Sequence, residues 1–502
     1  MQLRAFIFSF LLCSLLLGAS FAQNVRVGLA EDPDILDPDL GRTYVGRIVF
    51  ASLCDKLFDI TPDLEIVPQL SAGYEVSEDG LQLTINLREG VMFHDGTPLN
   101  AEAVKYNLER SKTLPGSNRA SELEQLESVE VVDSTTVRLN LSQPFAPLIA
   151  LLADRAGMMV SPSAAEEAGE NFGNNPVCAG PFRFTDRVAQ DRITLERFPD
   201  YWDAESINVG GVTFLPIPDD SVRLANLQSG DLDIMERAAP TDLEAIRNDP
   251  NLGLPSAPSL GYQGLTINLS NPEPRDNPLS SDERVREALE LALDRNIINQ
   301  VVFNDEFIVG NQAVPPSSPW YIDEYTIPER NVEGARALLD EAGVDRVAFE
   351  LMVANDPQAV RLGEVIQSLV AEAGFDVSIR ATEFATALDE QEQGNYDVFQ
   401  VGWSGRIDPD GNIHQFQTCE GNLNEAGYCN EEVDRLLNEA RAETGTDARF
   451  ELYRQAGMEN YLPSRHIIYL YHQQLFFPHV ASMEGFEAYP DGIIRFQGVT
   501  LN

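Results

Sequence analysis

Hydrophobic and polar residues alternate along several stretches of the chain, which is the pattern of strands with one buried face. The apolar positions of the first clear stretch are Leu81, Leu83, Ile85 and Leu87. A second stretch, residues 129–141, is interrupted by Asp133 and Ser134 and therefore predicts a hairpin. Between the two, Asn100 is placed to cap a helix. The N-terminal half is thus predicted to mix strands and helices.

Helical periodicity dominates the second half. Ser280 and Glu283 have the spacing of a capping box ahead of an apolar helical face. Asp356 and Pro357 open another helix, Gly374 ends it, and an alternating strand follows. This alternation of helices and strands predicts a mostly parallel sheet.

One loop of this half is the best-placed candidate for a binding site. An apolar strand from Tyr396 to Val401 runs directly into residues 402–412. Ligands of parallel sheets collect at loops that leave the carboxyl ends of strands.

The first 22 residues have the features of a signal peptide. Arg4 precedes an apolar run over residues 5–17, and small residues follow as far as Ala22. The run is shorter than the roughly 20 apolar residues that a membrane span needs. We therefore expect cleavage after Ala22 and a soluble periplasmic protein.

Acidic residues strongly outnumber basic ones. The 80 Asp and Glu against 35 Lys and Arg give a net charge of -45. Such a field repels nucleic acid and anionic lipid surfaces, so neither is expected as a partner. The acids are spread along the whole chain, which is typical of a solvated surface rather than of a cation site.

Four cysteines follow the predicted signal peptide: Cys54, Cys178, Cys419 and Cys429. An even number in an exported protein indicates disulfides, and three pairings are possible. The short loop between Cys419 and Cys429 favours that pair, which leaves Cys54 with Cys178. A zinc site is the alternative, but it would need clusters such as Cys-x-x-Cys, which the sequence lacks.

The sequence contains no phosphate loop, dinucleotide fingerprint, zinc-protease helix or serine nucleophile elbow. His466 and His472 lie in an apolar stretch, which predicts packed rather than ligating side chains. We therefore expect a protein that is not an enzyme and needs no cofactor. A secreted hydrolase or metalloenzyme with a dispersed site is the alternative from another class.

Several segments resemble, in order, the dipeptide-, oligopeptide- and nickel-binding proteins of ABC importers, family 5 of the bacterial extracellular solute-binding proteins. The strongest is residues 72–104, which contains FHDG between a strand and a helix. The others are NPVCAGPFRF at 175–184, GYQGLTIN at 261–268, RVREALELALDR at 284–295 and GWSGRIDPDG at 402–411. The resemblance covers essentially the whole chain after Ala22.

This resemblance implies an α/β, two-lobed Venus flytrap fold with an extra α+β subdomain in the N-terminal lobe. Lobe I would comprise residues 23–59, 180–262 and 472–502, the inserted subdomain residues 60–179, and lobe II residues 263–471. A monomer of this kind would close around a peptide-like small molecule and deliver it to permease subunits in the inner membrane. A ligand sensor or chaperone would use the same fold.

The loop at 402–411 departs from the family at the place that holds the ligand. Peptide-binding members have an acidic residue shortly after the Gly-Trp pair, and here that place is taken by Arg406. A guanidinium suits a carboxylate, so the change predicts an opine-like or otherwise carboxylate-bearing solute. The alternative is that Arg406 pairs within the loop with Asp408 or Asp410.

Other candidates for the binding cleft are aromatic and amide side chains, which line small-molecule pockets. They are Trp403, Tyr44, Tyr262 and Gln263, and core packing is the alternative for each aromatic residue. Asp408 is a candidate to receive an amine. His414 is a candidate metal ligand, because nickel-binding relatives use a His near this region, and an exposed loop histidine is the alternative.

Overall fold

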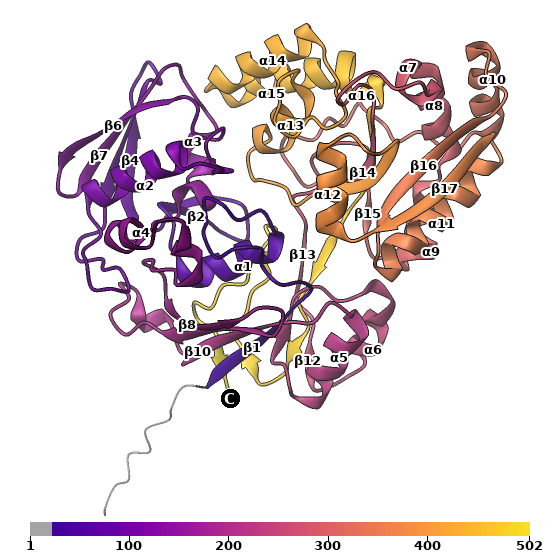
Figure 1. The fold of residues 1–502 in the computed structure, drawn as a ribbon. Coiled ribbons are helices and arrows are strands. Elements are labelled where there is room, and N and C mark those ends of the chain that lie inside the picture. The colour runs from indigo at the N-terminus through magenta and orange to yellow at the C-terminus, as the bar shows by residue number, and fades with distance from the viewer. Residues whose placement is uncertain (1–22) are drawn as a thin grey trace, which may run out of the picture.

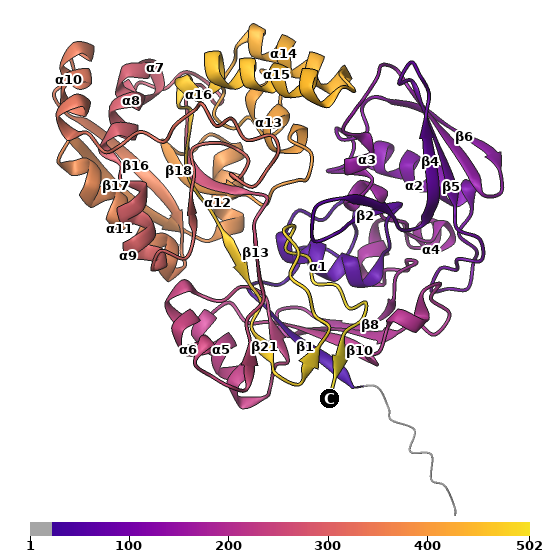
Figure 2. The same cartoon turned by 180° about the vertical axis from the view of Figure 1, so that it is seen from behind.

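The computed structural model describes residues 23–502, so the predicted signal peptide lies outside the described residues. The chain forms two bodies that face each other and are joined at their base (Figure 1). Figure 2 shows the same two bodies from behind, with β13 running from one to the other. Among residues 23–502, every helix is too short or too polar to cross a membrane.

Lobe I, as named here, is built on a seven-stranded sheet in the order β12-β21-β11-β1-β10-β9-β8. Its strands are β1 (Asn24–Leu29), β8 (Phe182–Val188), β9 (Arg192–Arg197), β10 (Gly211–Pro216), β11 (Ile234–Met235), β12 (Leu252–Gly253) and β21 (His479–Val480). Its helices are α1 (Tyr44–Leu53), α5 (Asp220–Ser229) and α6 (Leu243–Arg247). Strand β1 pairs in parallel with both β10 and β11, so the carboxyl ends of these three strands lie at one edge of the sheet.

The subdomain, as named here, is built on the antiparallel sheet β4-β5-β7-β6. Its elements are β4 (Ser71–Val76), β5 (Gln82–Leu87), β6 (Leu126–Asp133), β7 (Thr136–Leu141), α2 (Ala101–Thr113), α3 (Leu148–Leu151) and α4 (Pro162–Ala168). A small pair, β2 (Phe58–Ile60) and β3 (Ile66–Pro68), leads into it. The predicted strand and hairpin are confirmed, and so is the cap, because the Asn100 side chain accepts a hydrogen bond from the amide of Ala103 at 3.0 Å.

Lobe II, as named here, is built on the six-stranded sheet β15-β19-β14-β18-β16-β17. Its strands are β14 (Tyr262–Ile267), β15 (Ile308–Val309), β16 (Val347–Ala354), β17 (Phe375–Thr382), β18 (Val398–Trp403) and β19 (Ile467–His472). Its helices are α7 (Pro278–Ser281), α8 (Glu283–Ala292), α9 (Arg295–Phe303), α10 (Val332–Ala342), α11 (Pro357–Ala371), α12 (Phe384–Glu392), α13 (Asp410–Gln417), α14 (Glu431–Ala442), α15 (Thr446–Ala456) and α16 (Leu462–Ser464).

Two details of lobe II differ from the sequence-based expectation. The sheet is mixed: β16 is parallel to β17 and β18, whereas β14, which arrives from lobe I, pairs antiparallel with β18 and β19. The capping box at Ser280 is wrong, because Asp282 caps α8 and the Ser280 hydroxyl donates to the carbonyl of Asn268. The cap of α11 by Asp356 is confirmed.

The two segments that join the lobes pair with each other. Strand β13 (Ser256–Pro258) leads from lobe I into lobe II, and β20 (Gln474–Phe476) leads back. They form a two-stranded antiparallel sheet. After the return to lobe I, β22 (Met483–Glu484) and β23 (Thr500–Leu501) pair at the end of the chain. A paired double connection of this kind can bend while it keeps the lobes in register, which suits hinge motion.

Candidate functional site

The loop that follows β18 is held in shape by one amide side chain. The Asn412 side-chain oxygen accepts hydrogen bonds from the Arg406 amide at 2.7 Å and from the Trp403 indole at 3.1 Å. Its nitrogen donates to the Arg406 carbonyl at 2.8 Å. Gly405 has a φ of 82°, and a Cβ there would come within 2.2 Å of the Leu260 backbone. The loop conformation therefore requires glycine at this position.

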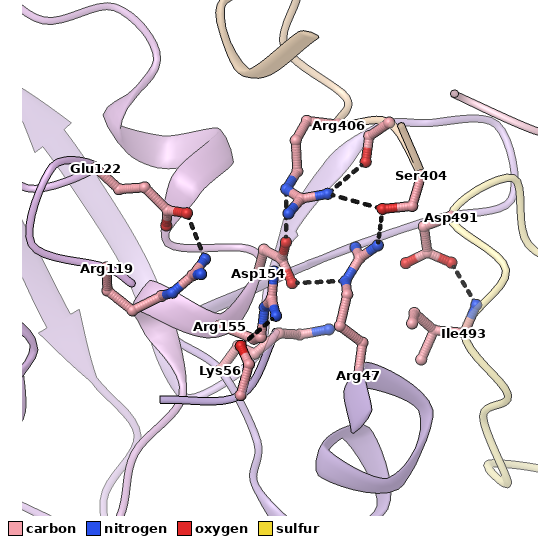
Figure 3. A network of polar contacts seen from close by, with 12 residues as sticks. Arg47, Lys56, Arg119, Glu122, Asp154, Arg155, Ser404, Arg406, Asp491 and Ile493 are labelled. Carbon is pink, nitrogen blue, oxygen red and sulfur yellow. Dashed lines mark hydrogen bonds and ion pairs between the residues drawn. The ribbon is translucent and has the colours of Figure 1, made fainter. Parts of the chain in front are cut away.

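The side chain of Arg406 reaches across to the subdomain. Its Nε lies 2.9 Å from a carboxylate oxygen of Asp154, and the guanidinium lies 4.5 Å from the ring centroid of Trp403. The side chain is only 9% exposed. The ion pair therefore joins lobe II to the segment that follows α3 (Figure 3).

Asp154 stands at the centre of a group of four arginines. Arg47 of α1 donates to its other oxygen at 3.2 Å, and Arg47 also reaches the hydroxyl of Ser404 at 3.5 Å. Arg155 donates to the carbonyl of Gly41 at 2.7 Å. The fourth, Arg119, pairs with Glu122. We call these four arginines the arginine cluster; Asp154 and Glu122 are its ion-pair partners, and the charge of Asp491 also acts on Arg47 (Figure 3).

The arginine cluster fixes the charge state of Asp154. Burial alone would raise the pKa of this carboxyl, but Arg47, Arg406, Arg155 and Arg119 together hold it well below its usual range. Burial lowers the pKa of Arg406 to about 10, against the stabilising charge of Asp154. The Nε atoms of Arg119 and Arg155 are buried and have no hydrogen-bond partner among the described residues. The Oδ2 of Asp154 also has no hydrogen-bond partner there, so the cluster holds unused donors and an unused acceptor that a polar ligand could engage.

A cavity of about 230 Å³ lies beside Arg406, between lobe II and the subdomain. Its lining includes Leu64, Ile66 and Ala150 on the subdomain side and Trp320, Arg406 and Asp408 on the lobe II side. Both polar and apolar side chains thus line a cavity between the two bodies.

The internal pairing of Arg406 with Asp408 or Asp410 is not present. Asp408 forms a bidentate pair with Arg449, with both oxygens at 2.6 Å. Asp410 forms a similar pair with Arg441, at 2.7 and 3.0 Å. Asp408 is therefore engaged by a guanidinium.

Two of the other predicted site residues lie opposite the start of this loop, because Tyr262 pairs with Trp403 and Gln263 with Gly402 across β14 and β18. Tyr262 is 4% exposed and packs edge-on against Tyr469 at 4.7 Å, as a core residue does. Gln263 accepts a hydrogen bond from Gln400 at 3.2 Å. Tyr44 is the first residue of α1, and its buried hydroxyl has no partner among the described residues.

The histidines show no metal site. His414 contacts Asn438, with 3.0 Å between its Nε2 and the amide oxygen. His466 is buried, stacks on Tyr428 with centroids 4.1 Å apart and contacts the Ser464 hydroxyl. Within residues 23–502, no three His, Cys, Asp or Glu side chains are grouped so that they could hold a metal ion.

Two disulfides are present, Cys54–Cys178 and Cys419–Cys429. The first joins the end of α1 to the segment that leads from the subdomain back into lobe I, and the second closes a short loop after α13. Both match the pairing that the short loop favoured.

Sequence reasoning missed Asp154 and three members of the arginine cluster. Arg47 and Asp154 are 107 residues apart, and Arg47 and Ser404 are 357 apart. The one available indication was the Asp-Arg pair directly after the apolar residues 148–153, because charges next to an apolar run become buried only when partners exist.

Comparison with known proteins agrees with this architecture. Residues 65–424 match the family described as bacterial extracellular solute-binding proteins, family 5 Middle. The chain is 29% identical over 493 residues to the glutathione-binding protein GsiB of Salmonella typhi, covering 96% of this chain and 95% of that protein.

Solved structures resemble it closely. The binding protein AgaA of A. tumefaciens R10 in complex with agropinic acid has a TM-score of 0.86 at 26% identity, covering 95% of this chain and 99% of that one. The dipeptide-binding protein of Pseudoalteromonas sp. SM9913 in complex with Met-Leu has a TM-score of 0.88 at 22% identity, covering 96% of this chain and 100% of that one.

Proposed function

The chain belongs to family 5 of the bacterial extracellular solute-binding proteins, and we propose that it captures a small carboxylate-bearing solute between its two lobes. It has the two-lobed α/β fold of the periplasmic binding proteins and is the periplasmic solute-binding component of an ABC importer. Members of this family work with ABC permeases. The identity of the solute is the part proposed here.

The arginine cluster is the observation that carries the proposal. The protein has a net charge of -45, yet four guanidinium groups gather where α1, the subdomain and the loop after β18 meet. Concentrating cations there costs desolvation and mutual repulsion, which an incoming anion offsets. A guanidinium binds carboxylates through paired hydrogen bonds, so a carboxylate is the anion that fits best.

The ion pairs around Asp154 also explain how capture would be linked to closure. Arg406 belongs to lobe II, Arg47 to lobe I and Asp154 to the subdomain. A solute that adds contacts to both sides stabilises the closed arrangement in proportion to its preference for that state. The permease would then receive the protein in its closed form.

The relatives agree with a small polar solute. One is named for binding glutathione, and one solved structure holds agropinic acid. The Met-Leu complex, at 22% identity, supports the fold alone.

The test is a thermal-shift and calorimetric titration with reduced glutathione, agropinic acid and Met-Leu, each with free and with amidated carboxylates. We expect free carboxylates to bind more tightly, and Arg406→Gln to weaken them roughly 10- to 100-fold, the value of a charge-assisted hydrogen bond. Arg346→Gln, an exposed arginine of lobe II, is the control. Undiminished binding of plain Met-Leu by Arg406→Gln would argue against the assignment.

Four further points belong to the same proposal. The mature chain would begin after Ala22, act as a monomer and release its solute chemically unchanged. The lobe boundaries would fall at residues 59/60, 179/180, 262/263 and 471/472, with β14 and β19 each extending one residue beyond the last two. Intact mass checks the cleavage site, light scattering checks the monomer, and recovery of unaltered solute after incubation checks that no reaction occurs. Turnover of the solute would favour a hydrolase instead.

A further inference from the structure

The carboxyl-terminal edge of the lobe I sheet carries charged residues that the arginine cluster does not include. Glu31 lies two residues beyond β1, and Glu236 and Arg237 lie directly beyond β11. The two strands are parallel neighbours, with Gly28 opposite Met235, so these residues come together at one edge. In α/β sheets, ligands bind outside the carboxyl ends of parallel strands.

The guanidinium of Arg237 is fixed at one nitrogen and, among the described residues, free at the other two. Its Nε donates to Glu236, which is fully buried and whose other oxygen accepts from the amide of Ala30 at 2.9 Å. The two terminal nitrogens of Arg237 make no hydrogen bond to any residue in the described part of the chain, and its side chain is 39% exposed. The backbone has a φ of 51°, a left-handed conformation that non-glycine residues adopt at some energetic cost.

This edge lies close to the arginine cluster. The guanidinium of Arg237 lies 5.5 Å from the ring centroid of Tyr44, whose buried hydroxyl lacks a partner among residues 23–502. Tyr44 is one turn before Arg47 on α1, and Arg47 pairs with Asp154. Arg237 and the arginine cluster therefore flank the same turn of α1.

Glu31 adds an acceptor beside Arg237. Its carboxylate makes no hydrogen bond to the residues that the structure describes, and its surface is half-buried. Burial raises its pKa, the charge of Arg237 opposes this, and Glu236, Asp34 and Glu383 add to the rise. Because Glu383 belongs to lobe II, at the start of α12, this edge opens toward lobe II.

We propose that Arg237 and Glu31 form a site for an α-amino-acid group, with the carboxylate of the solute on Arg237 and its ammonium on Glu31. A guanidinium and a carboxylate at one sheet edge match the two opposite charges that such a group carries on substituents of the same α-carbon. The inference depends on the proposed capture between lobes, and it narrows the solute to one with a free amino-acid head in addition to the carboxylate assigned to Arg406.

The test uses ligand-free protein dialysed against an aqueous extract of bacterial cells below about 3 kDa. Three forms of the extract serve as probes: untreated, N-acetylated and methyl-esterified. Mass spectrometry identifies what the wild-type protein retains, and calorimetry with that compound gives its affinity for Arg237→Gln, Glu31→Gln and the control Arg192→Gln. Arg192 is exposed to a similar extent, 43%, on β9.

We expect retention from the untreated extract alone and at least a tenfold loss of affinity in both Arg237→Gln and Glu31→Gln, with Arg192→Gln unchanged. Glu31→Gln keeps the test valid if Arg237→Gln fails to fold, because Glu31 makes no hydrogen bond in the described structure. Equal retention after acetylation, or an unchanged affinity in Glu31→Gln, would overturn the amino-acid site while leaving solute capture intact. Retention of nothing from any extract would instead overturn the proposed function.

Discussion

Replacing Asp154 by Asn should destabilise the protein far more than the loss of an ordinary surface ion pair. The carboxylate is 12% exposed and is shared between Arg47 and Arg406, with Arg155 and Arg119 contributing to its field. Removing one partner of a buried ion pair leaves an uncompensated charge and costs about 3–5 kcal/mol. Here the substitution removes the ion-pair partner of both Arg47 and Arg406, so we expect the upper part of that range.

The assay is urea unfolding of ligand-free protein, with Asp376→Asn as the matched control. Asp376 also pairs with an arginine, Arg346, but both side chains are more than half exposed, so its loss should cost under about 1 kcal/mol. Arg406→Gln should cost less than Asp154→Asn, because Asp154 keeps Arg47. A cost below about 1 kcal/mol for Asp154→Asn would show that Asp154 does not hold the lobes and the subdomain together.

Three further outcomes are expected. Asp408→Asn should destabilise the protein by removing the bidentate pair with Arg449, which lowers the urea midpoint while solute affinity changes little. A loss of affinity without a lower midpoint would instead identify Asp408 as a ligand-binding residue. Burial lowers the pKa of His466 to about 3 from an ordinary 6.5. The neutral side chain therefore contributes fully to the unfolding free energy above pH 6.5, and this contribution is lost at up to about 1.4 kcal/mol per pH unit as the pH falls toward 3. His466→Phe should flatten the dependence of the unfolding free energy on pH, and an unchanged dependence would contradict the prediction. Replacing Cys54 and Cys178 by Ala should lower the unfolding free energy by about 4–5 kcal/mol, because the disulfide joins residues 124 positions apart and so restricts the unfolded chain. An unfolding free energy within about 1 kcal/mol of the wild-type value would refute this prediction.

Local patterns of this fold could be predicted well from sequence. The alternation that gives β5 and the hairpin of β6 and β7 reports burial on one face, and the caps at Asn100 and Asp356 use backbone atoms within three residues. The mixed direction of the lobe II sheet could not be predicted, because β14 enters that sheet from lobe I and its direction depends on the hinge rather than on its own residues.

The site was predictable only in part. The loop after β18 was identified because it leaves the end of a strand, and the charge of Arg406 was visible in the sequence. Its partner Asp154 was not, since ion pairs between segments hundreds of residues apart leave no periodic pattern. The suggested partners within the loop pair with other arginines instead, Asp408 with Arg449 on α15 and Asp410 with Arg441 on α14.

A crystal structure of the protein with the solute that it retains from bacterial extract tests the central claim most directly. We predict one solute molecule between the lobes, with a carboxylate within hydrogen-bond distance of Arg406 or another member of the arginine cluster. A solute bound outside the interlobe space, or held there without any contact between a carboxylate and an arginine, would contradict it.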